Sequence, residues 1–327
     1  MNPVAERRPG RVLHTGQGVV DLVMRIPAIP EPGGDVFARA HELLAGGGVN
    51  VMVAAARDGA AVAHTGSHGT GPFGDLVRAA LTAEGVELLS PPDPDRDTGF
   101  SIALVDDSTE RTFISTSGAE AHSTLAQLDA ADARDGDVVC VSGYSLAHTA
   151  NREALLTWLP TIPAACTVVV DPSPVVGDAD LEAVRALLDR CDIWSSNERE
   201  ARLLLPRLDA SLDVAVIEDP SALAALLTAT TGRTVVLRAG ARGAFLATPG
   251  RDVVDVPAPL VRAVDTNGAG DAHTGVLCAR LAAGEDLHPA VRRAGVAAAL
   301  AVTRRGPATA PSAAETEAML AELTAGG

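Results

Sequence analysis

The stretch "VDTNGAGD" (264–271) places two carboxylates, Asp265 and Asp271, on either side of a glycine-rich turn. Backbone N–H groups at the start of a helix have no internal partner and carry the positive end of the helix dipole, so they bind anions. The turn offers three such amides, those of Gly268, Ala269 and Gly270. Asp271 would either stabilise the dipole or act as a general base that takes a proton from a hydroxyl attacking the bound anion.

Polar residues in the N-terminal part could hold a hydroxylated ligand. Asp21 follows "GQGVV", which we place just after a strand end, and its carboxylate can accept two hydroxyl donors or cap a turn. The run "AGGGVN" enters a helix at Asn50. Its glycines Gly46 and Gly47 permit close approach to a polyol, although they could also form only a loop.

Acidic residues also follow two later strand-like runs. Asn197 and Glu200 in "SNEREA" have the spacing of a capping box, which is compatible with a further role in binding. Asp171 in "DPSP" would end a strand, where it could form a turn or join the water shell of a magnesium ion. Arg111 in "STERTF" could be a solubilising residue or could pair with a ligand or phosphate.

The composition excludes several kinds of site. All 26 basic residues are arginine, so a Walker A lysine, a protein-kinase lysine and a pyridoxal Schiff base are excluded. The eight histidines lack metal-binding spacing, and the four cysteines form no C-x-x-C pair, so we expect buried thiols in a reducing cytosol. A net charge of −16 disfavours nucleic acid as a partner. A small-molecule ligand is therefore expected. We also expect a cytoplasmic protein, because neither a signal-like start nor a membrane-spanning run is found.

Strand-like and helix-like segments alternate along the 327 residues, which predicts an α/β fold with a mostly parallel sheet covered on both faces. Strands are expected at 11–16, 61–66, 137–143, 166–174, 191–197 and 233–240, and helices at 49–59, 73–85 and 271–284. Two segments interrupt this alternation, about 33–45 and a hairpin at 98–118 turning at 106–110. We expect them to form a small β lid inserted into one domain spanning 1–327.

The D-T-x-G-A-G-D pattern of residues 265–271 resembles the second signature of the ribokinase-like (PfkB) family of sugar and nucleoside kinases. The resemblance spans nearly the whole chain and appears in order along it. The segments that carry it are "GQGVVDLVM" (16–24), "AGGGVNVMVAAARDGA" (45–60), "TGSHGTGPFGD" (65–75), "SNEREA" (196–201), "RAGARG" (238–243) and "AAALAVTRRG" (297–306).

This resemblance implies a ribokinase-like three-layer α/β/α domain and a role for each matched residue. Asp271 would be the catalytic base, with the amides of 268–270 as the anion hole, and Asp21, Gly46, Gly47, Asn50 and Arg111 would bind the acceptor. ATP would contact Asn197, Glu200, Arg238, Gly240, Gly243, Thr266 and Asn267. Glu200 would hold Mg²⁺ through water, Asp171 would join its shell, and Asp265 with "TRRGPATA" (303–310) would hold a monovalent cation such as K⁺.

The chain departs from the family pattern at several of these positions. Arg238 replaces a frequent threonine, His273 a frequent aromatic or threonine, His68 replaces an acid, and Ala310 lacks a hydroxyl that some members use beside the cation. These changes leave the phosphoryl-transfer residues in place. They make the preference for acceptor and nucleotide harder to predict than the reaction type.

The sequence therefore predicts an ATP-dependent kinase that phosphorylates a primary hydroxyl of ribose, fructose or a similar sugar, and we expect a homodimer. A nucleoside kinase of the same fold and a non-catalytic sugar- or nucleotide-binding protein are the alternatives. A Rossmann dehydrogenase, suggested by "GQGVVD", is excluded because Asp21 stands where the third glycine of G-x-G-x-x-G should be.

Overall fold

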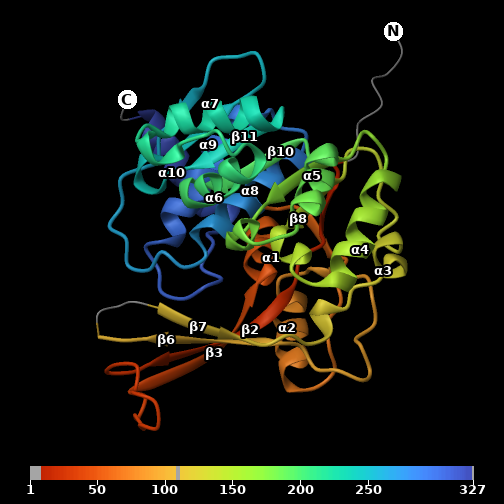
Figure 1. Cartoon of the computed structure of the whole chain (residues 1–327), viewed down its shortest axis with the longest axis vertical. Coiled ribbons are helices and arrows are strands. Elements are labelled where there is room, and N and C mark those ends of the chain that lie inside the picture. The colour runs from red at the N-terminus through yellow and green to blue at the C-terminus, as the bar shows by residue number, and fades with distance from the viewer. Residues whose placement is uncertain (1–8, 108–110, 326–327) are drawn as a thin grey trace.

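The computed structural model describes residues 9–107 and 111–325, which form one large and one small β-sheet (Figure 1). Nine strands make up the large sheet within these residues. From one edge to the other they are β13 (Val254–Val256), β12 (Ala244–Ala247), β11 (Thr234–Arg238), β10 (Ile193–Asn197), β9 (Thr167–Asp171), β8 (Val138–Ser142), β1 (Arg11–His14), β4 (Ala61–His64) and β5 (Glu87–Leu88).

Within this sheet, the strands β11, β10, β9, β8, β1, β4 and β5 are parallel to one another. Strand β12 pairs antiparallel with β11, and β13 pairs antiparallel with β12. The parallel strands are short apolar runs because both faces of the sheet are covered. In β8, Val138 and Cys140 belong to one buried cluster and Val139 and Val141 to the other. Alternate side chains of a strand thus fill two separate cores.

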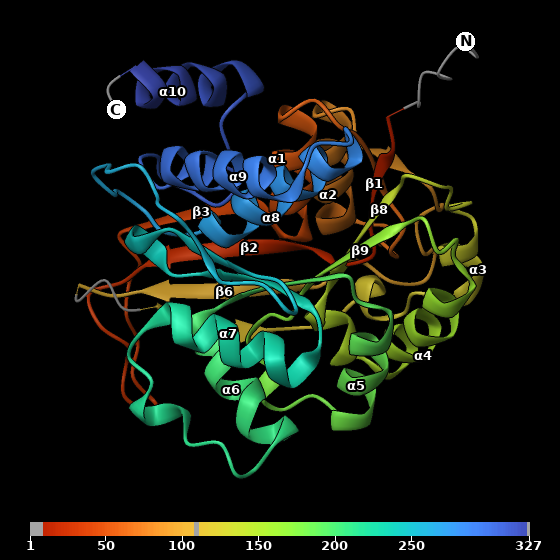
Figure 2. The ribbon, with the colours of Figure 1, turned by 90° about the horizontal axis from the view of Figure 1, so that it is seen from above.

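Helices cover both faces of the large sheet, as seen from above in Figure 2. The first layer contains α1 (Gly48–Arg57), α2 (Pro72–Ala83), α8 (Ala269–Ala282) and α9 (Leu287–Ala301), with α10 (Ala313–Ala325) packed on α9. The second contains α3 (Leu125–Asp129), α4 (Thr149–Trp158), α5 (Leu181–Arg190), α6 (Glu198–Leu208) and α7 (Pro220–Thr231). The predicted three-layer α/β/α architecture is confirmed.

The small sheet projects from this body (Figure 1), and its strands pair in the order β3–β2–β6–β7. Their bounds are β3 (Ala40–Gly47), β2 (Gly18–Arg25), β6 (Phe100–Val105) and β7 (Arg111–Ser115). The segments 33–45 and 98–118 thus contribute three strands, although 33–39 carries none, and residues 108–110 of the expected turn lie outside the described residues.

Two expectations about element boundaries were wrong. Asp21 lies within β2 of the small sheet, rather than just after a strand end of the large one, because the chain leaves β1 at His14 and starts a new sheet at Gly18. Helix α8 begins at Ala269, two residues before the expected start at Asp271. Ala269 and Gly270 therefore belong to the first helical turn and not to the loop before it, and residues 257–267 form no strand.

Candidate active site

Three adjacent parallel strands end in the polar residues Asp171 (β9), Asn197 (β10) and Arg238 (β11). The strand register places Asn197 beside Arg238, and the carboxyl ends of the strands form one rim. Ligands of open α/β sheets bind at such a rim. The sequence-based placement of Asp171 at a strand end is therefore confirmed.

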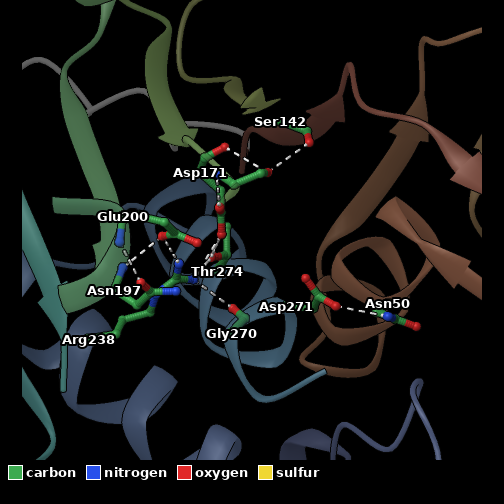
Figure 3. A network of polar contacts seen from close by, with 10 residues as sticks. Asn50, Ser142, Asp171, Asn197, Glu200, Arg238, Gly270, Asp271 and Thr274 are labelled. Carbon is green, nitrogen blue, oxygen red and sulfur yellow. Dashed lines mark hydrogen bonds and ion pairs between the residues drawn. The ribbon is translucent and has the colours of Figure 1, made fainter. Parts of the chain in front are cut away.

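The Arg238 guanidinium lies at the centre of a polar network (Figure 3). Its Nη1 donates to Asp171 Oδ2 at 2.9 Å, to the Gly270 carbonyl at 3.1 Å and to Thr274 Oγ1 at 2.8 Å. Its Nη2 lies 3.5 Å from Glu200 Oε2. Arg238 thus joins two carboxylates to the first turn of α8.

Asn197 and Glu200 form the predicted capping box at the start of α6. The Asn197 side chain accepts from Glu200 N at 2.9 Å, and Glu200 Oε2 accepts from Asn197 N at 2.8 Å. Burial raises the pKa of Glu200, while the positive charge of Arg238 acts in the opposite direction. The box fixes the Glu200 carboxylate at the rim of the sheet.

Asp271 lies in the first turn of α8 and faces α1, apart from the Arg238 network (Figure 3). Its Oδ2 accepts from Asn50 Nδ2 at 2.8 Å. Burial raises the pKa of Asp271 to about 6, although the hydrogen bond from Asn50 lowers it. Asn50 Oδ1 is buried without a partner in the described part of the chain, so a donor on a ligand could satisfy it.

Close packing of α1 and α8 brings these two side chains together. A Cβ built on Gly275 would lie only 2.3 Å from the Val51 carbonyl, so α8 can approach α1 this closely only with glycine there. Gly275 follows Asp271 by about one helical turn, and Val51 is next to Asn50. A distant pair in the sequence therefore becomes a hydrogen-bonded pair in the fold.

Gly46 of β3 lies diagonally across from Asp21 of β2, because the register pairs Gly46 with Val19 and Asp21 with Leu44. A Cβ built on Gly46 would be 2.0 Å from Asp21 Oδ2. Burial raises the pKa of Asp21 to about 6. Gly47 is the N-cap of α1, the helix that carries Asn50, so one segment connects the small sheet to the Asn50–Asp271 pair.

A cavity of about 400 Å³ opens on the other side of the α8 start. Small and apolar residues of the 258–263 segment and of α9 form much of its wall. Seven residues predicted to bind the nucleotide or its phosphates line it: Asn197, Arg238, Gly240, Gly243, Thr266, Ala269 and Gly270. His273 also lines it, with both ring nitrogens unpartnered among the described residues.

Several predicted residues lie outside this cavity. Asn267 donates its backbone N–H to Asp265 Oδ1 at 3.0 Å, and Asp265 Oδ2 accepts from Gly306 N at 3.3 Å. The Asp265 carboxylate thus joins the turn before α8 to the loop 303–310. Arg111 begins β7, and its side chain lies outside the part that the structure describes.

The fold brings to this rim three further residues that no sequence motif indicated. Thr274 Oγ1 bridges Arg238 and Asp171, and its helical spacing of four from Gly270 could have indicated this. Ser173 has a positive φ of 56°, which strains a non-glycine residue, and its backbone N–H donates to Asp171 Oδ1 at 3.1 Å. Tyr144 follows β8, and its pKa is raised by burial and by the charges of Asp271 and Asp171.

The described residues form no complete metal site by themselves. No three His, Cys, Asp or Glu side chains among them converge to hold a metal ion. All four cysteines are free and buried, as expected. In the residues searched, no helix has the length and apolar character needed to cross a membrane.

The chain is similar in sequence to known sugar kinases. The chain is 29% identical over 305 residues to the uncharacterized sugar kinase YegV of Escherichia coli, covering 92% of this chain and 91% of that protein. It is 30% identical over 322 residues to the ATP-dependent ribose-1-phosphate kinase of Halopiger xanaduensis, covering 95% of this chain and 98% of that protein.

Solved structures share the fold at lower sequence identity. The ribokinase of Thermotoga maritima superposes with a TM-score of 0.80 at 21% identity, covering 95% of this chain and 99% of that one. A putative ribokinase II of E. coli, solved with ATP and Mg²⁺, gives a TM-score of 0.78 at 24% identity, covering 96% and 99%. The sequence profile of the pfkB family of carbohydrate kinases matches residues 14–314. Because the family profile covers nearly the whole chain, this protein belongs to the pfkB family of carbohydrate kinases.

Proposed function

We propose that this protein transfers the γ-phosphate of ATP to a primary hydroxyl of a sugar such as ribose or fructose, with Asp271 as the general base. The observation that carries the proposal is the position of Asp271. Its carboxylate is held by Asn50 of α1 in the first turn of α8, the helix whose start also lines the large cavity. An acid, an anion-binding helix start and a nucleotide-sized cavity adjoin there.

The acceptor sugar would lie between the small sheet and α1. Asp21 would accept two of its hydroxyl donors, and a third could satisfy the buried Asn50 Oδ1. Gly46 and Gly47 would let the sugar approach the backbone. In this pose the small sheet acts as a lid, and Arg111 on its β7 strand would contact the acceptor or a phosphate.

Proton removal would fall to Asp271. One carboxylate oxygen accepts from Asn50, which leaves the other for the acceptor hydroxyl. With a pKa of about 6, Asp271 is ionised at neutral pH and is a stronger base than an ordinary aspartate. The amides of Gly268, Ala269 and Gly270 would stabilise the negative charge on the transferred group.

The nucleotide would occupy the 400 Å³ cavity, whose wall includes Thr266 and much of the 238–243 loop. Asn267, which follows Thr266 but does not line the cavity, would contact the phosphates from its edge. Carboxylate oxygens and waters suit Mg²⁺, so Glu200 and Asp171 fit a water-mediated site that is completed by phosphate oxygens. A bound magnesium ion would supply positive charge to the ATP phosphates.

We also propose a monovalent cation such as K⁺ between Asp265 and the loop 303–310. The loop adjoins the anion hole, since a Cβ built on Gly268 would lie 2.4 Å from the Pro307 carbonyl. Asp265 faces this loop through Gly306 N. Higher turnover in KCl than in tetramethylammonium chloride at equal ionic strength would support this cation, whereas equal turnover would argue against it.

The remaining expectations concern the whole chain. We propose one kinase domain over 1–327, a homodimer and a cytoplasmic location. Four apolar residues of the small sheet support the dimer, because the strand registers align Leu43, Leu22, Ile102 and Ile114 in one row across it. Leu43 and Ile114, at the ends of this row, are 43% and 56% exposed.

The test is an ADP-release screen over ribose, fructose, other ketoses, sugar phosphates and nucleosides, run on the wild type and on Asp271→Asn. We expect one sugar to stimulate ADP release. In the variant kcat should fall by about 10²–10⁴, the usual contribution of a positioned base, while ATP affinity persists. A nucleoside as the best acceptor would favour the related nucleoside kinase. Wild-type kcat in Asp271→Asn would refute the mechanism.

A further inference from the structure

The guanidinium of Arg238 occupies the place where the proposed magnesium ligands meet. Asp171 Oδ2 accepts from Arg238 at 2.9 Å and from Thr274 at 3.2 Å, and Asp171 Oδ1 accepts from Ser173 N at 3.1 Å. Both oxygens of this carboxylate are therefore already hydrogen-bonded within the protein.

Glu200 is held in a similar way. Its Oε2 accepts from Asn197 N at 2.8 Å and lies 3.5 Å from Arg238 Nη2. The Arg238, Asp171 and Glu200 side chains are 11%, 17% and 4% exposed, so their charges are only weakly screened by water. One arginine thus balances two acids inside the protein.

A carboxylate that ligates a cation or its water shell has to give up competing donors. The guanidinium carries a fixed positive charge and five N–H donors, and it does not deprotonate in proteins. It therefore competes with a divalent ion for the same oxygens through charge as well as through hydrogen bonds. The family pattern often has threonine at this position. Threonine is neutral and would not compete with a divalent ion for the carboxylates.

From this arrangement we infer that Arg238 is an internal counter-cation that holds Asp171 and Glu200 in place and competes with the divalent metal for them in the nucleotide-free protein. The inference deepens the proposed function, on whose assignment of the two acids as metal partners it rests. Arg238 is thus a positioning residue that makes metal binding depend on the nucleotide, whose phosphates supply further ligands.

A nucleotide bound in the cavity would offer its phosphates to the Arg238 guanidinium in place of the two carboxylates. Arg238 lines this cavity together with Gly240 and Gly270. Phosphate is a preferred partner of arginine, and the chain contains no lysine for this task. When the nucleotide brings its metal, Arg238 would exchange carboxylate oxygens for phosphate oxygens without leaving the site.

The experiment measures Mn²⁺ binding to the protein without nucleotide or sugar, from the loss of the free Mn²⁺ EPR signal, with Mg²⁺ as competitor. Arg238→Gln should bind Mn²⁺ at least tenfold more tightly than the wild type, and Arg238→Lys, which keeps the charge, should stay near the wild type. Arg242→Gln is the matched control, because Arg242 lies on the same loop and pairs with the different acid Glu198 at 2.7 Å. Its Mn²⁺ affinity should not change.

A second variant is needed in case Arg238→Gln does not fold, because removal of one partner from a buried ion pair can unfold a protein. Thr274→Val keeps the side-chain volume and removes a hydrogen-bond partner from both Arg238 and Asp171. It should tighten Mn²⁺ binding two- to threefold. Unchanged or weaker binding in the folded Arg238→Gln protein, or in Thr274→Val if the former does not fold, would overturn the inference. Failure of the kinase proposal would appear separately, as absent ADP release by the wild type.

Discussion

Asp271 and Asp21 are acids of ordinary type in unusual surroundings. Burial raises the pKa of each to about 6. Protonation of Asp271 would remove the proposed base, and protonation of Asp21 would remove a hydroxyl acceptor. Because the protonated fraction grows as pH falls below the pKa, both effects reduce activity on the acid side of pH 6.

The pH profile should show both groups. We expect log kcat/KM for the sugar to fall below about pH 6 with a slope approaching two, since kcat/KM reports ionisations of the free enzyme. Of these two groups only Asp271 remains in Asp21→Asn, so the slope should fall by one. A wild-type profile that stays flat down to pH 4.5 would show that neither carboxylate has to be ionised.

Substitution of Asp21 should separate the two substrates. Because a hydrogen bond to a charged group contributes about 1.5–3 kcal/mol, Asp21→Ala should raise the sugar KM by tenfold or more and leave the ATP KM nearly unchanged. Isothermal titration with sugar and with an ATP analogue measures both affinities directly. Equal losses for the two ligands would indicate that Asp21 has a structural role.

At the scale of elements, the contact between α1 and α8 positions the site. Their approach at Gly275 leaves no room for a side chain, since the Val51 carbonyl and Ala54 Cβ would lie 2.3 Å and 2.7 Å from an added Cβ. Backbone of α1 cannot move aside as a flexible side chain could. The distance between Asn50 and Asp271 is therefore set by a glycine that touches neither substrate.

We expect Gly275→Ala to lower the free energy of unfolding by about 1–3 kcal/mol, the usual cost of overpacking, and to reduce kcat by separating Asp271 from Asn50. Gly177→Ala is the control, because the atoms nearest to its added Cβ are side-chain atoms of Leu203 at 3.4 Å, an ordinary van der Waals distance, and Gly177 does not line the nucleotide cavity. That variant should be as stable as the wild type or slightly more stable. Thermal unfolding and kcat of both variants test the contact, and equal behaviour of the two would contradict it.

At the scale of the whole molecule, the small sheet leaves an apolar row exposed. The registers that align Leu22, Leu43, Ile102 and Ile114 put their side chains on one face, whereas neighbouring Phe113 points to the other. Exposed apolar patches of this kind mark interaction surfaces. A second copy of the chain is the partner we propose for it.

Light scattering on two neighbouring variants tests the dimer. Ile114 and Phe113 are 56% and 58% exposed and lie on opposite faces of β7. We expect Ile114→Asp to be monomeric, since it places a charge in the interface, and Phe113→Asp to remain dimeric. A monomeric wild type, or a dimeric Ile114→Asp protein, would refute the proposed interface.

Much of this protein could be predicted from local sequence patterns. The parallel strands were recognisable because strands buried on both faces are short apolar runs, as in "DVVCVSG". The capping box at Asn197 and Glu200 depends on a spacing of three residues. The presence of a helix at "NGAGD" depends on glycine and an acid in adjacent positions, although its first residue was expected two positions too late. Such features involve neighbours in the chain, so the sequence alone determined them, along with the absence of lysine and its consequences for phosphate binding.

Only the tertiary structure decided how distant segments meet. Asn50 and Asp271 are 221 residues apart, and Arg238 lies 67 residues from Asp171. Their contacts depend on the packing of helices and the order of strands, which no local pattern encodes. The same is true of Asp21, whose place in β2 follows from pairing with β3 and β6. The sequence determined which groups are available for chemistry, and the fold decided that an arginine lies between the acids, because charge pairing inside a protein depends on distance in space.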